Sequence, residues 1–202
     1  MKRLHCSWFF VCCALASACS YRIGDEAHEQ IATGTTLTIP YVNDDSDGQF
    51  TDELIKAFAA SGVFVYRPSD GALELSVKIL SQDNKSLGWR YNRNPQGKRN
   101  KDLISVEGRR HVAAEVTLID SLNDEVLLGP VVVEADLDFD CYEPDSIRDL
   151  SFVNSSGVRQ TSIAFSLGQL DSIEGAYDSA WTPVSRLLAK KILDLILHAS
   201  YY

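Results

Sequence analysis

Residues 36–66 read TLTIPYVNDDSDGQFTDELIKAFAASGVFVY, and this stretch decides the fold. Its two ends, 36–40 and 63–66, are short runs rich in β-branched and aromatic residues, which are typical of strands. Between them, apolar residues recur every four positions: Phe50, Leu54 and Phe58. That spacing places them on one face of a helix, which Gly62 can end. The stretch therefore predicts a strand, an amphipathic helix and a second strand, with the helix packed on a sheet.

Polar residues mark the start of this helix. Thr51 is predicted to be its N-cap, with Asp52 and Glu53 in the first turn. The preceding Asn43–Gly48 (NDDSDG) resembles the first half of a calcium loop, but the twelfth position holds Leu54 instead of the required Glu. We therefore interpret this segment as a turn that places acidic residues before the helix, with calcium binding as the alternative, and expect no metal site.

Alternating apolar residues predict three further strands, at 72–80, 111–119 and 125–139. The last of these contains Gly129-Pro130, which should introduce a bulge or kink. A closing helix is expected from Thr182-Pro183, with proline at its first position. It carries one apolar stripe: Val184, Leu187, Leu188, Ile192, Leu195 and Ala199. We predict an α+β fold, a two-layer sandwich of one mixed four- to five-stranded β-sheet with two main helices on one face.

The amino terminus resembles a bacterial lipoprotein signal peptide, residues 1–18. A positive start, Met1–Arg3, precedes the uncharged stretch SWFFVCCALASA at 7–18, which is too short to span a bilayer of about 30 Å. Small residues precede Cys19, although Ala16 stands where such signals usually hold Leu. We predict that Cys19 becomes the first mature residue and is acylated, by chains such as palmitate, and so forms a lipid anchor. Cleavage elsewhere is the alternative.

The expected domain organisation follows from this cleavage. It comprises the signal peptide at 1–18, an N-terminal tether at 19–35 and a single α/β sandwich domain at 36–202. The residue after Cys19 is Ser20 rather than Asp, which resembles an outer-membrane sorting signal. We therefore expect a lipid-anchored outer-membrane protein.

Charge and cysteine content exclude some functions. Removal of Lys2 and Arg3 takes the net charge from −9 to −11, which argues against nucleic acid as a partner. Cys141 would be the only mature cysteine besides the acylated Cys19, so no internal disulfide framework is expected. A buried, inert thiol is expected at Cys141, with an intermolecular bridge as the alternative.

The segment Asn84–Arg110 has eight basic and two acidic residues in a chain of net charge −9. Trp89 and Tyr91 are interleaved with the basic residues, and Pro95 and Gly97 indicate a loop joining two strands. Guanidinium groups suit bidentate binding of phosphate or carboxylate. Six residues are candidates for binding a ligand phosphate or a partner: Lys85, Arg90, Arg93, Lys98, Arg99 and Lys101. The alternative is a solvated hairpin tip whose charge only serves solubility.

The sequence contains no HExxH motif, no Cys/His metal spacing, no phosphate-binding glycine loop and no GxSxG motif. Asp136, Asp138 and Asp140 alternate along one strand face, where solvated edge residues are expected rather than a catalytic pair. We therefore expect a non-enzymatic protein with no catalytic residues and no cofactor.

The chain resembles the LptE family, the lipopolysaccharide-assembly lipoproteins of the outer membrane. The resemblance is carried by Cys19-Ser20-Tyr21 and by the stretch 36–66, in which a strand ending in "IP" leads to a helix and a second strand. The alternating strands at 72–120 and the closing helix at 183–199 extend it over most of the mature chain.

The resemblance implies a non-enzymatic role that plugs and supports an LptD-type β-barrel and assists lipopolysaccharide transport and assembly at the cell surface. An LptD-like outer-membrane β-barrel and lipopolysaccharide are thus the expected partners, besides the membrane, and the chain is expected on the periplasmic or barrel-lumen side. The resemblance also places basic residues of the strand-joining loop near lipopolysaccharide phosphates: Arg90, Arg93, Lys98, Arg99 and Lys101. The alternative function is a periplasmic-facing lipoprotein adaptor that binds other envelope proteins.

Overall fold

The structure, a computed structural model, describes residues 31–94, 98–142, 151–161 and 171–199. The predicted signal peptide, Cys19 and most of the predicted tether lie outside these ranges. Within the described part of the chain, no helix is long and apolar enough to cross a membrane.

A mixed β-sheet forms one layer of the fold. Its strands, in spatial order, are β2 (Phe64–Arg67), β1 (Thr35–Thr38), β3 (Leu73–Arg93), β4 (Arg99–Asp120), β5 (Glu125–Tyr142) and β8 (Asp171–Ser172). The pairs β1–β2, β1–β3 and β5–β8 are parallel, whereas β3–β4 and β4–β5 are antiparallel. The predicted mixed sheet is confirmed, and the two-residue strand β8 adds a sixth member at one edge.

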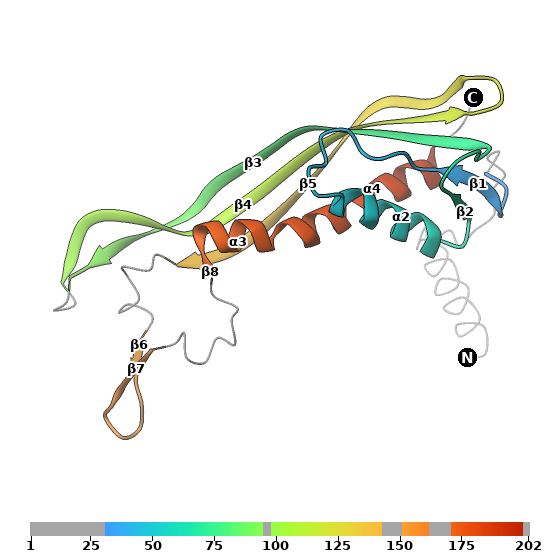
Figure 1. The fold of residues 1–202 in the computed structure, drawn as a ribbon. Coiled ribbons are helices and arrows are strands. Elements are labelled where there is room, and N and C mark those ends of the chain that lie inside the picture. The colour runs from blue at the N-terminus through green and yellow to red at the C-terminus, as the bar shows by residue number, and fades with distance from the viewer. Residues whose placement is uncertain (1–30, 95–97, 143–150, 162–170, 200–202) are drawn as a thin grey trace, which may run out of the picture. The chain divides into compact units, whose positions relative to one another are not determined.

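Helices cover one face of this sheet, as predicted (Figure 1). The two main helices are α2 (Gln49–Ala60) and α4 (Trp181–His198), and a short helix, α3 (Ile173–Ser179), precedes α4. A separate two-stranded sheet pairs β6 (Ser151–Val153) with β7 (Arg159–Thr161) in antiparallel fashion.

The core lies between the helix layer and the sheet. The predicted α2 face is confirmed, because Phe50, Leu54 and Phe58 are all 0% exposed. Three residues of the α4 stripe are buried to the same degree: Val184, Leu188 and Ile192. Alternate residues of β3 and β4 contribute to the same core from the sheet: Leu75, Val77, Val112, Ala114, Val116 and Leu118. Each large buried apolar side chain contributes about 1.5–3 kcal/mol, so this contact holds the two layers together.

The start of α2 differs from the prediction that Thr51 is the N-cap. The helix begins at Gln49 after Gly48, whose φ of +74° favours glycine. The buried Asp45 carboxylate accepts hydrogen bonds from the Thr51 amide (2.8 Å) and hydroxyl (2.7 Å). Asp47 Oδ1 accepts one from the Gln49 amide at 3.1 Å. The NDDSDG turn thus uses its carboxylates to satisfy the amides of the first helical turn, which is their electrostatically favoured place.

The prediction of a loop over Asn84–Arg110 is wrong. Strand β3 continues to Arg93 and β4 starts at Arg99, so most of this segment is paired as a hairpin. Most of its residues are polar or charged, and the alternation of Leu87, Trp89 and Tyr91 with polar residues is short. Pro95 and Gly97 follow it closely and indicated a loop. By contrast, the predicted irregularity at Gly129-Pro130 is confirmed as a register shift between β4 and β5, and β5 runs through it.

Candidate functional site

The outer end of the β3–β4 hairpin forms the candidate site. Pairing of β5 with β4 ends at Glu107 opposite Asp140, and beyond this point β3 and β4 pair only with each other in the described sheet. We call the two segments Trp89–Arg93 and Arg99–Ser105 the tip ribbon. It continues past the ends of α3 and α4 (Figure 1). Among the described residues, no helix covers its side chains, whereas helices cover the rest of the hairpin.

Three arginines gather around an aromatic ring on the tip ribbon. Arg90, Arg93 and Arg99 line an open cavity of about 360 Å³ together with Tyr91. The guanidinium carbon of Arg99 lies 3.5 Å from the centroid of the Tyr91 ring, a cation–π contact. This contact fixes the exposed Arg99 over a flat ring, with the exposed Arg93 nearby. Arg90 is only part-exposed, and two of its guanidinium nitrogens are buried. Guanidinium groups gathered in this way are typical of sites that bind an anion.

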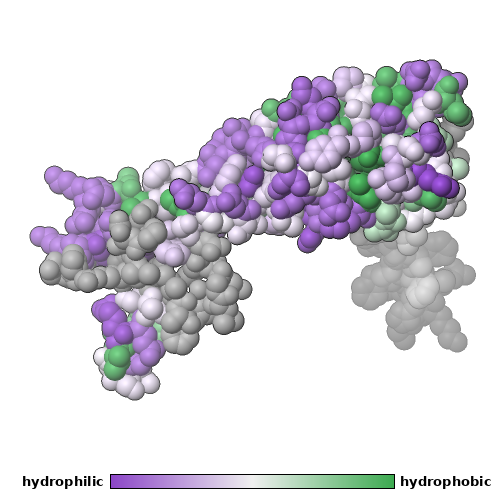
Figure 2. Space-filling view, in the orientation of Figure 1, coloured by the Kyte–Doolittle hydropathy of each residue, from purple (hydrophilic) through white to green (hydrophobic). Residues whose placement is uncertain are grey.

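Apolar side chains accompany these cations. Leu103 lies directly opposite Tyr91 in the ribbon, so both side chains point to the same face. Trp89, two residues before Tyr91, is 56% exposed, and Leu103 is 54% exposed. Figure 2 shows this end of the molecule as mainly hydrophilic, with hydrophobic side chains beside the basic ones. A surface that presents both kinds of group suits an amphiphilic anion or a protein interface.

The charge of the tip ribbon contrasts with that of the whole chain. Residues 89–105 contain five basic residues and one acidic residue, Asp102, in a chain of net charge −9. Such a local excess attracts anions over a distance of roughly one Debye length, about 8 Å at physiological salt.

The structure separates the predicted basic residues into two groups. Lys98 directly precedes the second segment of the tip ribbon, and its amide donates to the Asn94 side chain at 2.9 Å. Lys101 is an exposed residue of β4 in the same ribbon. Lys85 lies elsewhere, opposite Arg109 in the three-stranded part of the sheet. It precedes Arg93 by eight positions, which is roughly 26 Å along a strand. Lys85 therefore does not belong to the arginine cluster.

Two further basic residues of Asn84–Arg110 have structural partners. Arg109 donates two hydrogen bonds to the Asp138 carboxylate, at 2.6 and 2.9 Å, which raises the pKa of Arg109 and lowers that of Asp138. Arg110 is buried and donates to the Tyr177 carbonyl at 2.6 Å, and burial lowers its pKa. The exposed positive charge of this segment is therefore smaller than its composition indicates.

Two aspartates of β5 and Cys141 occupy structural positions. Besides the Asp138–Arg109 pair, Asp136 contacts His111 Nδ1 at 2.8 Å across the sheet face without helices. Cys141 is buried, as expected, with its thiol 3.9 Å from the Ser105 carbonyl. Among the described residues, no group of His, Cys, Asp and Glu is arranged to hold a metal ion.

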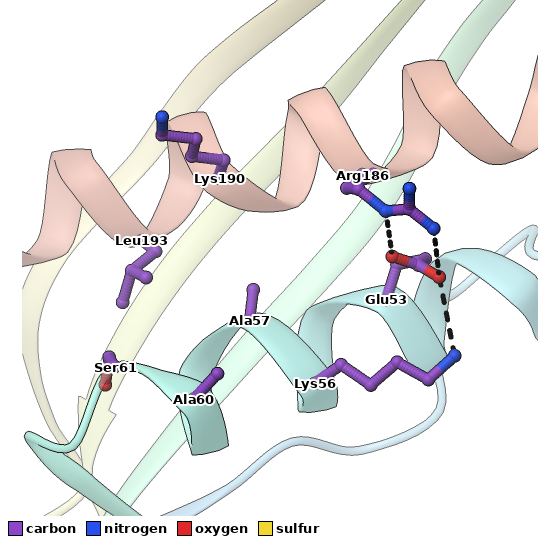
Figure 3. A pocket seen from close by; sticks show the side chains of 8 residues that line it. All are labelled: Glu53, Lys56, Ala57, Ala60, Ser61, Arg186, Lys190 and Leu193. Carbon is purple, nitrogen blue, oxygen red and sulfur yellow. Dashed lines mark hydrogen bonds and ion pairs between the residues drawn. The ribbon is translucent and has the colours of Figure 1, made fainter.

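A second surface feature was not predicted from the sequence: a groove between α2 and α4, with a volume of about 530 Å³ (Figure 3). We call it the α2–α4 groove, and it is lined by Glu53, Lys56, Ala57 and Ala60 of α2 and by Arg186, Lys190 and Leu193 of α4. The only sequence signal was the spacing of Glu53 and Lys56 on one helix face.

An ion-pair network closes one end of the α2–α4 groove. Arg186 Nε donates to Glu53 Oε2 at 3.0 Å, and Lys56 Nζ donates to Glu53 Oε1 at 3.4 Å (Figure 3). The Arg186 hydrogen bond is the main reason why the pKa of Glu53 lies below its ordinary value. Glu53 is therefore a charged, mostly buried carboxylate that joins the two main helices.

The sequence matches no protein-family model and no curated protein. Solved structures with a similar chain path include a minor lipoprotein from Acinetobacter baumannii, with 13% identity and a TM-score of 0.44 over 82% of this chain and 92% of that one. The hypothetical protein CT253 from Chlamydia trachomatis has 9% identity and a TM-score of 0.44 over 82% and 96%. Rare lipoprotein B from Shewanella oneidensis has 13% identity and a TM-score of 0.38 over 80% and 90%. All three scores are below 0.5, so no function of this chain follows from them.

Proposed function

We propose that this chain is a non-enzymatic outer-membrane lipoprotein that binds lipopolysaccharide phosphates through its tip ribbon and supports an LptD-type β-barrel. The observation that carries this proposal is the cluster of Arg90, Arg93 and Arg99 around Tyr91. It stands on an exposed ribbon in an otherwise acidic chain.

The chemistry of the cluster supports a phosphorylated amphiphile as the ligand. Guanidinium groups bind phosphate through two parallel hydrogen bonds, and several of them together match a ligand that carries more than one negative charge. Exposed Trp89 and Leu103 provide apolar surface next to these donors. A small hydrophilic anion would not use that surface, whereas the glycolipid part of lipopolysaccharide would.

The strand geometry supports a barrel as the partner. In the described sheet, no third strand pairs with either strand of the tip ribbon. Strands at the edge of a sheet are the ones that can pair with a strand of another chain. The predicted acylation of Cys19 would keep the domain at the membrane in which such a barrel resides.

Binding of purified lipopolysaccharide by the full-length protein tests the proposal. The double variant Arg93→Ser/Arg99→Ser should weaken binding by about tenfold or more, because two charge-assisted contacts are removed. The binding of the unmodified protein should also weaken as salt is added. Lys85→Ser is the control, since it removes an exposed charge outside the cluster. An equal loss in the control, or none in the double variant, would contradict the proposal.

A periplasmic-facing adaptor for envelope proteins is the second candidate. The exposed Leu87, Trp89 and Leu103 favour it, because aromatic and aliphatic groups commonly anchor protein interfaces. Crosslinking of native membranes followed by mass spectrometry separates the two functions. A β-barrel crosslinked to the wild-type protein supports the first function. The adaptor is supported if the crosslinked partner is a soluble envelope protein, if Trp89→Ser loses this partner, and if the lipopolysaccharide distribution is unchanged.

A further inference from the structure

The floor of the α2–α4 groove is apolar. Ala57 and Ala60 contribute it from α2, and Leu193 contributes it from α4, with Ala57 and Leu193 packed against the core (Figure 3). Because the alanine side chains are short, the helices leave space between them at the surface. Methyl-lined grooves of several hundred Å³ suit alkyl chains, which gain free energy by leaving water.

The rim of the groove is positively charged. Arg186 and Lys190 are one turn apart on α4, so they lie on the same helix face, and Lys56 faces them from α2. Only Glu53 opposes these three cations within the lining. The lining therefore has a net charge of about two positive units in a chain of net charge −9, and it favours an anion.

Two of the cations keep capacity for a ligand. Arg186 donates from Nε and Nη2 to Glu53, and its Nη1 has no hydrogen-bond partner among the described residues. The Arg186 side chain is 68% exposed. Lys190 is exposed and has no ion pair in the part of the chain that the structure describes. Lys56 differs, because it is also paired with Asp52 at 2.5 Å. The free donors thus lie on α4, beside the apolar floor.

We propose that the α2–α4 groove binds one alkyl chain of an anionic lipid, with the phosphate of its headgroup held by Arg186 and Lys190. Free phosphate is excluded as the intended ligand because it would leave the apolar floor in water. This site is separate from the tip ribbon, and the proposal does not depend on the function proposed above.

Photolabelling of the full-length protein tests the groove. The probe is hexadecyl phosphate with a diazirine in its chain, applied to protein held in amphipol, and labelled residues are mapped by mass spectrometry. We expect labels on residues 53–61 of α2 and 186–193 of α4. Unlabelled hexadecyl phosphate should compete about tenfold better than hexadecanol, and inorganic phosphate and hexadecyltrimethylammonium should not compete.

Two pairs of matched variants locate the site. Lys190→Glu should reduce labelling by about tenfold, whereas Lys191→Glu should not, because Lys191 donates to the Glu134 carbonyl of β5 at 2.8 Å and does not line the groove. Ala60→Leu should block the floor, whereas Ala59→Leu, also exposed but outside the lining, should leave labelling unchanged.

The proposal is overturned if the three hexadecyl compounds compete equally, if the labels lie outside the two helices, or if Lys190→Glu and Lys191→Glu behave alike. The Arg93→Ser/Arg99→Ser variant should retain full labelling of the groove. Loss of lipopolysaccharide binding in that variant with retained groove labelling shows that the two sites are independent. Loss of groove labelling in that variant also overturns the proposal.

Discussion

The two halves of the β3–β4 hairpin are built differently, although they belong to the same strands. In the inner half, alternate residues from Leu73 to Ile79 are buried against the helices. In the outer half, the tip ribbon exposes arginines and aromatic residues. Burial of one face requires apolar alternation, whereas a ribbon without a helix layer is free of that requirement. The sheet therefore exposes basic and aromatic side chains where it extends beyond the described helices, and this is the part that we propose binds a ligand.

The largest expected effect breaks the inner half. Phe58 is 0% exposed and its ring centroid lies 5.3 Å from that of Phe64 on β2. Phe58→Ala should lower the free energy of unfolding by about 3–5 kcal/mol, because it leaves a cavity between the layers. Urea denaturation measures this loss. A change below about 1 kcal/mol would mean that α2 is not packed as described.

A second prediction concerns the boundary between the halves. The buried Arg110 donates hydrogen bonds to the backbone carbonyl of Tyr177 and to Gln82 Oε1. Its guanidinium carbon lies 4.6 Å from the Trp181 ring centroid. Arg110→Ala should lower the free energy of unfolding by about 2–3 kcal/mol, since it removes a buried side chain that packs against two aromatic rings and makes two part-buried hydrogen bonds. Arg109→Ala, its exposed neighbour, is the matched control and should cost clearly less. If thermal unfolding shows equal losses of stability for the two variants, the buried position of Arg110 adds nothing to stability.

Glu53 allows a pH-dependent test of the helix layer. Its pKa in the folded protein lies below its ordinary value near 4.5, so its contribution is full above that pH and is lost as the pH falls through the lowered pKa. Glu53→Gln should therefore reduce stability by about 0.5–1 kcal/mol at pH 7, a small value because Arg186 and Lys56 are solvent-exposed. The difference from wild type should shrink at pH 3. A difference that grows on acidification contradicts this assignment.

The sequence predicted those parts of the fold in which one face is buried. The spacing of apolar residues predicted both the buried face of α2, with Phe50, Leu54 and Phe58, and the inner strands. The prediction of a loop at the tip ribbon is wrong, because the alternation of Leu87, Trp89 and Tyr91 is short and stands among charged residues beside Pro95 and Gly97. Composition correctly drew attention to its arginines, but could not show that Arg109 and Arg110 have structural partners.

The α2–α4 groove was beyond sequence reasoning for a different reason. Glu53 and Arg186 are 133 positions apart in the chain, so their contact depends on how two helices cross the same sheet. Periodicity predicts which face of each helix is buried, but not which residues of the outer faces become neighbours.

The smallest expected effect on stability belongs to the tip ribbon. Because Trp89 is 56% exposed and lies outside the core, Trp89→Ser should change the free energy of unfolding by no more than about 0.5 kcal/mol. Thermal unfolding of this variant, beside Phe58→Ala, measures the contrast between the two halves directly. A loss comparable to that of Phe58→Ala would mean that Trp89 packs into the fold. An unchanged unfolding curve together with weakened lipopolysaccharide or partner binding would show that this large side chain is kept at the surface for recognition, since it contributes nothing to folding there.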